Sequence, residues 1–349
     1  MIPLTFRALL LAALASLGWW AHVFAADLSS ASTPAPAGIA VDGEGNVYVS
    51  DYALDRVVKF GPDGSVLSQW GGTGSALGQF NSPFGVAIDA SNTLFVVDQL
   101  NNRVQRFAAD GTALSAWGTA GAAAGDLRTP FGVAVSGGRV YVADFGNDRV
   151  EVFGQDGSLL STLGGRGSGD GQFQRPAGVA VGPDGTLYVT DHFNDRVQRF
   201  NGEGRFQAQL GVPLLAAATS TTTPTPVATA VPTPSVTATP TASTSAGVVD
   251  ANQLRRPEGI VVDRDGDVWV ADYGHDRVVK VAADGRLLLS WGSRGSAPGE
   301  FVGPKGVAID PSTGRVYVAD TGNARVQRLA PDGTPDASWP MPPLQPSGS

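Results

Sequence analysis

Few side chains in this sequence are equipped for chemistry. The 349-residue chain holds three histidines and no cysteine, which excludes thiolate zinc sites, disulfides and cysteine nucleophiles. His192 and His275 follow a recurring Val-x-Asp segment by one and by three residues, so they occupy different registers. Two histidines in different registers do not make a three-histidine zinc centre. The sequence predicts no catalytic residue, no bound metal ion and no cofactor.

The segment Asp263-Arg264-Asp265-Gly266-Asp267 begins like a calcium-binding loop, but the glutamate that should end such a loop is missing. It falls at the same place in its repeat as Asp42–Gly45 and Gly182–Gly185. An Asp-Gly hairpin turn explains all three segments. We favour the turn over a calcium site.

Aspartate and arginine recur together, the arginine always five positions after the aspartate. The pairs are Asp51 and Arg56, Asp98 and Arg103, Asp144 and Arg149, Asp191 and Arg196, Asp272 and Arg277, and Asp320 and Arg325. A catalytic group is needed once, whereas these residues occur six times. We interpret them as structural, with each aspartate capping a turn and each arginine pairing across the boundary between neighbouring repeats.

The elements that hold these residues follow from the repeat itself. Its opening prolines are Pro36, Pro83, Pro130, Pro176, Pro257 and Pro304, at spacings of 47, 47, 46, 81 and 47. Within the second copy, period-two segments at 85–88, 94–97, 103–107 and 113–117 predict four short strands. Four antiparallel strands in each of six units predict an all-β fold, a six-bladed β-propeller of four-stranded antiparallel blades.

The repeats resemble the NHL family. The resemblance lies in segments such as Asp144-Phe145-Gly146-Asn147-Asp148-Arg149-Val150 and in Trp-Gly-x-x-Gly segments such as 70–80 and 291–301. It implies a six-bladed propeller. Some similar propellers are metal-dependent lyases that use histidines from several blades, a set that this sequence lacks. Others, attached to tripartite-motif or ubiquitin-ligase modules, bind RNA or protein, and the absence of cysteine excludes a RING module here.

The chain divides into four kinds of segment. Residues 1–26 read as a secretory signal peptide, with Arg7 before an apolar run and Val23-Phe24-Ala25 at the cleavage site, although an uncleaved anchor is the alternative. Residues 27–340 form a single propeller, interrupted by a Thr/Pro-rich disordered insertion at 212–250, and 341–349 form a disordered tail. We expect a secreted or cell-surface protein without a stable membrane span after cleavage.

The charge balance bears on partners. The formal net charge is −8, whereas proteins that neutralise phosphates usually carry a basic excess. Nucleic acid is therefore disfavoured, although a local basic patch around Arg128, Arg175, Arg255 and Arg256 is conceivable. Nothing in the sequence determines the oligomeric state.

Some positions vary between copies while their neighbours do not, and strand order places them at one mouth of the channel. The residues after the aspartates and within the Pro-x-Gly turns supply the candidate ligand-binding set: Tyr52, Phe84, Gln99, Phe131, Phe145, His192, Glu258, Tyr273, Lys305 and Thr321. An aromatic face with a few charges suits a protein, peptide or glycan ligand. The alternative is that these aromatics only cover the blade ends.

Our leading hypothesis is a non-catalytic binding scaffold with a sensor or adhesion role. The second is a metal-dependent propeller enzyme of the lyase or lactonase type. The third is an RNA- or protein-binding module like that of the tripartite-motif relatives.

Overall fold

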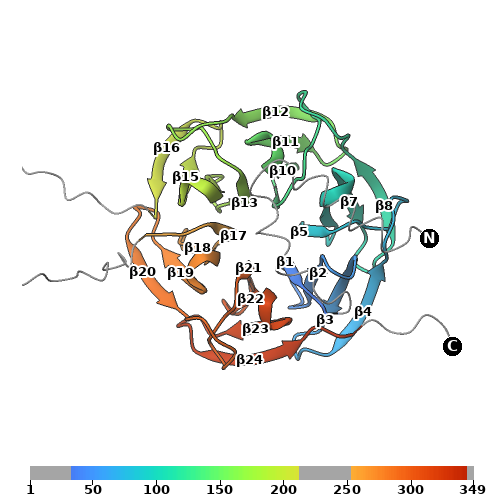
Figure 1. Cartoon of the computed structure of the whole chain (residues 1–349), viewed down its shortest axis with the longest axis vertical. Helices are drawn as coiled ribbons and strands as arrows, with labels where there is room; N and C mark the ends of the chain where they lie inside the picture. Colours follow the sequence, from blue (N-terminus) through green and yellow to red (C-terminus); the bar gives the residue numbers. More distant parts are fainter. Residues whose placement is uncertain (1–32, 212–252, 344–349) are drawn as a thin grey trace, which may run out of the picture.

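Short apolar segments separated by Asp-Gly turns fold into antiparallel strands, four to each repeat. The computed structural model describes residues 33–211 and 253–343. Its six four-stranded sheets stand around a central channel, with the first strand of each blade innermost and the fourth on the outer rim (Figure 1). The predicted six-bladed, all-β propeller is confirmed.

The strand order is consecutive in every blade. Blades one to three are β1 (Pro36–Val41), β2 (Val47–Asp51), β3 (Arg56–Phe60) and β4 (Val66–Gly71); β5 (Pro83–Ile88), β6 (Leu94–Asp98), β7 (Arg103–Phe107) and β8 (Ala113–Trp117); and β9 (Val133–Ser136), β10 (Arg139–Asp144), β11 (Arg149–Gly154) and β12 (Leu159–Gly164). Blades four to six are β13 (Pro176–Val181), β14 (Leu187–Asp191), β15 (Arg196–Phe200) and β16 (Phe206–Leu210); β17 (Pro257–Val262), β18 (Val268–Asp272), β19 (Arg277–Val281) and β20 (Leu287–Trp291); and β21 (Pro304–Ile309), β22 (Val316–Asp320), β23 (Arg325–Leu329) and β24 (Pro335–Pro340).

A short 3-10 turn joins the second and third strands of blades two to six. These turns are η1 (Gln99–Asn101), η2 (Phe145–Asn147), η3 (His192–Asn194), η4 (Tyr273–His275) and η5 (Thr321–Asn323). The next residue has a φ of 51–56°, in the left-handed region, and is Asn or Asp in blades two to five. Asn and Asp tolerate this region better than most residues. The turn brings each strand-ending aspartate opposite the arginine that starts the next strand.

The core lies between blades rather than within them. One cluster, for example, combines Tyr48 and Val57 of blade one with Phe80, Leu94 and Phe107 of blade two. Six such clusters fill the six blade junctions, including the one between blades six and one. Each sheet therefore buries both faces only when its neighbours are present.

Glycine sets how closely the inner strands approach. The Pro-x-Gly segments, which we expected to form turns, begin or directly precede the innermost strand of each blade. In each of them, a Cβ on the glycine would collide with the carbonyl oxygen of residue x in the following blade. The six glycines are Gly38, Gly85, Gly132, Gly178, Gly259 and Gly306, and the last meets Ala37 of blade one. The repeated glycine is thus required by close backbone contact around the whole ring.

Within the described residues, blade six closes on blade one without sharing a strand. Hydrogen bonds cross this junction in addition to the packing of side chains. The Thr321 hydroxyl donates to the Pro36 carbonyl at 2.7 Å, and the Arg56 guanidinium donates to the carbonyls of Pro342 and Pro343. Met341 is buried in the junction core.

The C-terminal boundary of the propeller therefore differs from the prediction. Residues 341–343, which we assigned to a disordered tail, take part in ring closure. The predicted signal peptide, the insertion at 212–250 and the rest of the tail lie outside the described residues. Within the described ranges, no helix is long and apolar enough to cross a membrane.

We predict that Gly132→Ala destabilises the propeller by about 1–3 kcal/mol, because its Cβ would lie 2.5 Å from the Ala177 carbonyl oxygen. Urea unfolding of wild type and variant measures the loss. Gly43→Ala is the matched control, since a Cβ there meets nothing within 4 Å. Equal stability of the two variants would contradict the close-approach argument.

Candidate functional site

Each aspartate–arginine pair joins the end of a blade's second strand to the start of its third. In blade two the buried Asp98 carboxylate accepts hydrogen bonds from the Asn81 amide at 2.7 Å, Asn101 Nδ2 at 2.9 Å and Arg103 Nε at 2.7 Å. Burial raises the pKa of the Asp98 carboxyl above its ordinary value, and the hydrogen bonds from these donors offset only part of that rise. The other five aspartates are also fully buried, and each lies 2.7–3.1 Å from its arginine.

These ion pairs lie within a blade, so the expectation that they cross the blade boundary is wrong. The reason is the antiparallel register, which puts Asp98 directly opposite Arg103. The boundary is crossed instead by the outer guanidinium nitrogens. Those of Arg103 donate to the carbonyls of Ser75, Ala76 and Gln79 in the segment that arrives from blade one. One arginine therefore fixes both a strand end and an incoming linker.

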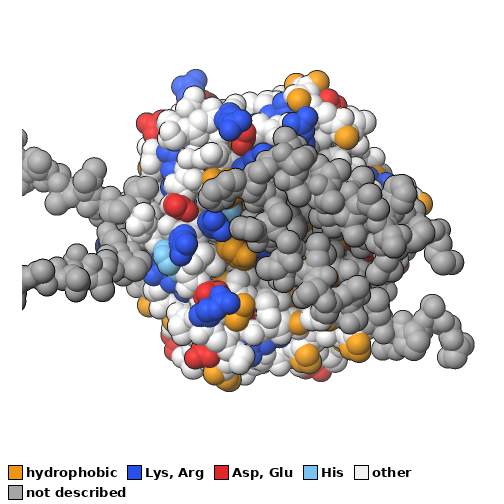
Figure 2. Space-filling model, viewed as in Figure 1, with side chains coloured by type: hydrophobic (Ala, Val, Ile, Leu, Met, Phe, Trp, Pro, Cys, Tyr) orange, Lys and Arg blue, Asp and Glu red, His pale blue; other side chains and the backbone are white. Residues whose placement is uncertain are grey.

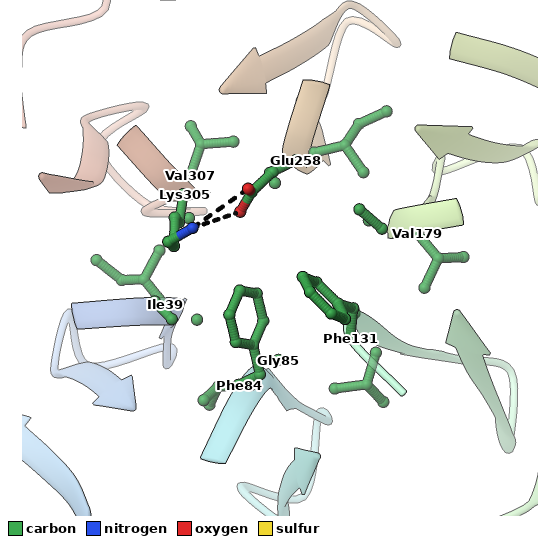
Figure 3. A pocket seen from close by; sticks show the side chains of 18 residues that line it. Ile39, Phe84, Gly85, Phe131, Val179, Glu258, Lys305 and Val307 are labelled. Atoms are coloured by element: carbon green, nitrogen blue, oxygen red, sulfur yellow. Dashed lines mark hydrogen bonds and ion pairs between the residues drawn. The ribbon is translucent and has the colours of Figure 1, made fainter. Parts of the chain in front are cut away.

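Four of the predicted site residues converge on the channel. Phe84 and Phe131 point into it from one side, and Glu258 and Lys305 form an ion pair on the other (Figure 3). The Lys305 Nζ lies 3.2 and 3.4 Å from the two carboxylate oxygens of Glu258, and both residues are buried. The channel here encloses a cavity of about 60 Å³. That volume holds a few water molecules and is far below that of a typical small-molecule site.

An arc of rings continues from the channel around its mouth. Phe131 stacks on Phe145 with centroids 4.1 Å apart and an interplanar angle of 15°, and Phe84 lies 4.3 Å from Phe131. Tyr52 extends the arc on one side, at 6.0 Å from Phe84. Phe84, Phe131 and Phe145 are all buried, so little of their ring surface is exposed at the mouth.

Opposite the arc, the ammonium group of Lys305 lies over the ring of Tyr273. Its Nζ is 4.4 Å from the ring centroid of Tyr273, which is half-buried. Cation–π contact of this kind stabilises a partly desolvated ammonium group. The mouth is therefore apolar over blades two and three and ionic over blades five and six.

Three further predicted site residues, Thr321, Gln99 and His192, have different environments. The Thr321 hydroxyl is used in ring closure. The side chain of Gln99 is buried, and among the described residues neither its amide nitrogen nor its amide oxygen has a hydrogen-bond partner. Nδ1 of the buried His192 lies 3.3 Å from the Pro257 carbonyl. Since a carbonyl only accepts, Nδ1 is the protonated nitrogen of a neutral ring.

His275 makes the hydrogen bond to the strand-ending aspartate that an asparagine makes in most other blades. Its Nδ1 lies 2.9 Å from Asp272 Oδ2, and in blades two, three, four and six an asparagine Nδ2 donates to the equivalent oxygen. Among residues 33–211 and 253–343, no group of three or more His, Cys, Asp or Glu side chains is arranged to hold a metal ion. In the segment that resembles a calcium loop, the Lys280 ammonium lies 3.0 Å from both Asp263 and Asp267.

The sequence reasoning missed several residues at this face. Phe193 follows His192 and is 41% exposed, the most exposed aromatic ring of the described chain. Ser50 and Thr190 carry hydroxyls that bridge neighbouring inner strands, Thr190 donating to the Glu258 carbonyl at 2.8 Å. Arg166 lies in the linker before blade four. Comparing the same register across the copies would have revealed Ser50, Thr190 and Phe193 as departures from the repeat, whereas Arg166 shares its register with Arg294.

We predict that His275→Asn leaves the free energy of unfolding within about 0.5 kcal/mol of wild type, because asparagine already serves this position in four blades. His275→Ala should cost about 1–2 kcal/mol, since the buried Asp272 carboxylate loses a donor. Denaturant titrations of the three proteins test this. A His275→Asn protein as unstable as His275→Ala would refute the structural role.

We also predict acid destabilisation through His192. Burial, together with the charges of Lys305 and Arg256, lowers its pKa from 6.5 to about 3. Between about pH 6.5 and pH 3, His192 is therefore protonated in the unfolded chain but neutral in the folded chain. The free energy of unfolding falls as the pH drops below about 6.5. At pH 5 the loss should be roughly 1–2 kcal/mol relative to pH 7. In His192→Phe the loss between these pH values should be smaller by that amount, and an identical pH dependence would contradict the prediction.

Comparison with known proteins agrees with the geometry. The NHL repeat model matches residues 127–153, 173–200, 254–281 and 301–329, one segment in each of blades three to six. Peptidyl-glycine alpha-amidating monooxygenase B of Xenopus laevis is 40% identical over 62 residues, which is 17% of this chain and only 7% of that protein.

Solved structures resemble the chain at the level of fold. A catalytically inactive virginiamycin B lyase from Staphylococcus aureus with quinupristin superposes with a TM-score of 0.56 and 13% identity, covering 89% of this chain and 85% of the lyase. A gluconolactonase from Xanthomonas campestris gives a TM-score of 0.56 and 18% identity, covering 83% and 84%. The protein is therefore a six-bladed β-propeller with NHL repeats in blades three to six, and blades one and two have the same four-stranded design.

Proposed function

We propose that the protein is a non-catalytic binding scaffold, exported or displayed at the cell surface, which holds a protein, peptide or glycan at the channel mouth. The observation that carries the proposal is a division of roles between residues. The repeated aspartates, arginines and glycines are engaged in the ring, whereas the residues that differ between blades gather at one mouth. The small channel cavity favours a ligand bound over the mouth rather than a small substrate enclosed within it.

The competing function is an enzyme of the lyase or lactonase type, suggested by the folds of the virginiamycin B lyase and the gluconolactonase. These likenesses concern the fold, and fold does not determine function. Within the described chain, His275 bonds to Asp272 and His192 to the Pro257 carbonyl, so both histidines already serve the scaffold. Loss of a lyase or lactonase activity in His192→Phe would favour the enzyme.

The test of the scaffold is selection of ligands from a displayed peptide library and a glycan array, followed by affinity measurements. The double variant Phe193→Ala with Tyr273→Ala should weaken binding of the selected ligand about tenfold or more, as loss of an aromatic anchor does. Leu160→Ala is the control, because Leu160 is 54% exposed on the outer strand β12, far from the mouth. Unchanged affinity in the double variant, or equal loss in the control, would refute the assignment of the mouth.

A further inference from the structure

Five arginines surround one side of the mouth: Arg128, Arg166, Arg175, Arg255 and Arg256, which we call the basic crescent. They precede the inner strands of blades three, four and five. Figure 2 shows Lys and Arg side chains left of the centre of this face, over blades four and five. The formal net charge of the chain is −8, so this cluster runs against the overall charge.

The scaffold does not require arginine at these places. The amide of Arg128 donates to Asp144 and that of Arg255 to Asp272, but the same bond is made by the amide of Val302 in blade six. The backbone contact is thus independent of the side chain. The stems of Arg128 and Arg255 lie over Gly146 and Gly274, in the turns beside the mouth.

Arg175 and Arg256 occupy a conformation that suits glycine better. Their φ angles are 59° and 49°, in the left-handed region, and the equivalent residue of blade six is Gly303. Arginine at such a position is less favourable than glycine. The same left-handed conformation is adopted by Ser82 and Thr129 in blades two and three, so this position does not require arginine for the fold.

The crescent differs from the repeated arginines in its partners. Every repeated arginine is ion-paired with its aspartate, whereas Arg128, Arg166, Arg255 and Arg256 make no ion pair with any described residue.

The fifth arginine is ordered by aromatic and backbone contacts. Arg175 lies 5.5 Å above the Phe145 ring and donates to the Phe145 carbonyl at 3.2 Å. Burial and the nearby charges of Arg166 and Arg128 lower the pKa of Arg175, consistent with crowded positive charge. The carboxylates that face the crescent, Asp148 and Asp195, already accept the amides of Arg175 and Arg256.

We propose that the basic crescent recognises an acidic peptide segment, rich in Asp and Glu, of a partner protein. Guanidinium groups match carboxylates in geometry and bind them through paired hydrogen bonds. The half-buried Tyr273 and the exposed Phe193 flank the crescent with the aromatic residues typical of protein interfaces. Phe131 and Phe145 are only 5% and 6% exposed, so they offer no open face on which nucleic-acid bases could stack. The inference deepens the proposed scaffold function and rests on it.

The test measures binding of a fluorescent oligoglutamate peptide to the whole protein at low salt, with oligoglutamine and oligouridylate as comparison probes. The double variant Arg128→Gln with Arg255→Gln should bind oligoglutamate about 3- to 10-fold more weakly, and added salt should weaken wild-type binding. The control is Arg205→Gln with Arg286→Gln, two exposed arginines of outer hairpin turns. It makes the same change in net charge and should leave the affinity unchanged.

Three results would overturn the inference: no oligoglutamate binding, equal weakening in the control variant, or tighter binding of oligouridylate. The last would point to nucleic acid as the ligand. If the crescent variant retains full affinity while Phe193→Ala with Tyr273→Ala loses the library-selected ligand, the acidic-peptide inference fails and the scaffold function stands. If neither variant affects any selected ligand, the mouth itself is wrongly assigned.

Discussion

The inner ring of this propeller depends on the close approach of neighbouring backbones, which only glycine permits at six positions. At each Pro-x-Gly segment, the backbone of one blade approaches the carbonyl of the next so closely that a Cβ could not fit, and Gly306 makes the same approach to Ala37 across the closing junction. This contact fixes the radius of the channel. It also directs residue x of every segment into the channel, and at that place the blades differ from one another.

Around this ring, repeated and divergent residues have separate physical roles. The buried Asp98 collects donors from its own blade, and Arg103 extends the same network to the linker from the previous blade. At the closing junction, the carbonyls of Pro342 and Pro343 take the place of that linker for Arg56. Because the scaffold is satisfied in this way, neighbouring side chains such as Phe131 and Lys305 can vary without loss of the fold.

The buried Glu258–Lys305 ion pair is one such variation between blades, and it has an energetic cost. Removing two charges from water is expensive, and the attraction between them offsets only part of that cost. The pair lies against Tyr273 and faces the aromatic arc of Phe84 and Phe131. A mouth divided in this way into apolar and ionic sides is asymmetric, although the ring that carries it repeats six times, and asymmetry is what a specific ligand requires.

The sequence by itself determined the fold, because a register repeated six times fixes strand length, turn chemistry and blade number locally. It also placed residues such as Tyr52 and His192 at one face, since strand order decides which loops share an end. Only the tertiary structure decided which side chains interact with one another. Arg103 bonds to Asp98 within its own blade because the turn sets them opposite, and Glu258 meets Lys305 only through the close approach of two inner strands. Contacts between blades join residues tens of positions apart, so spacing along the chain does not encode them.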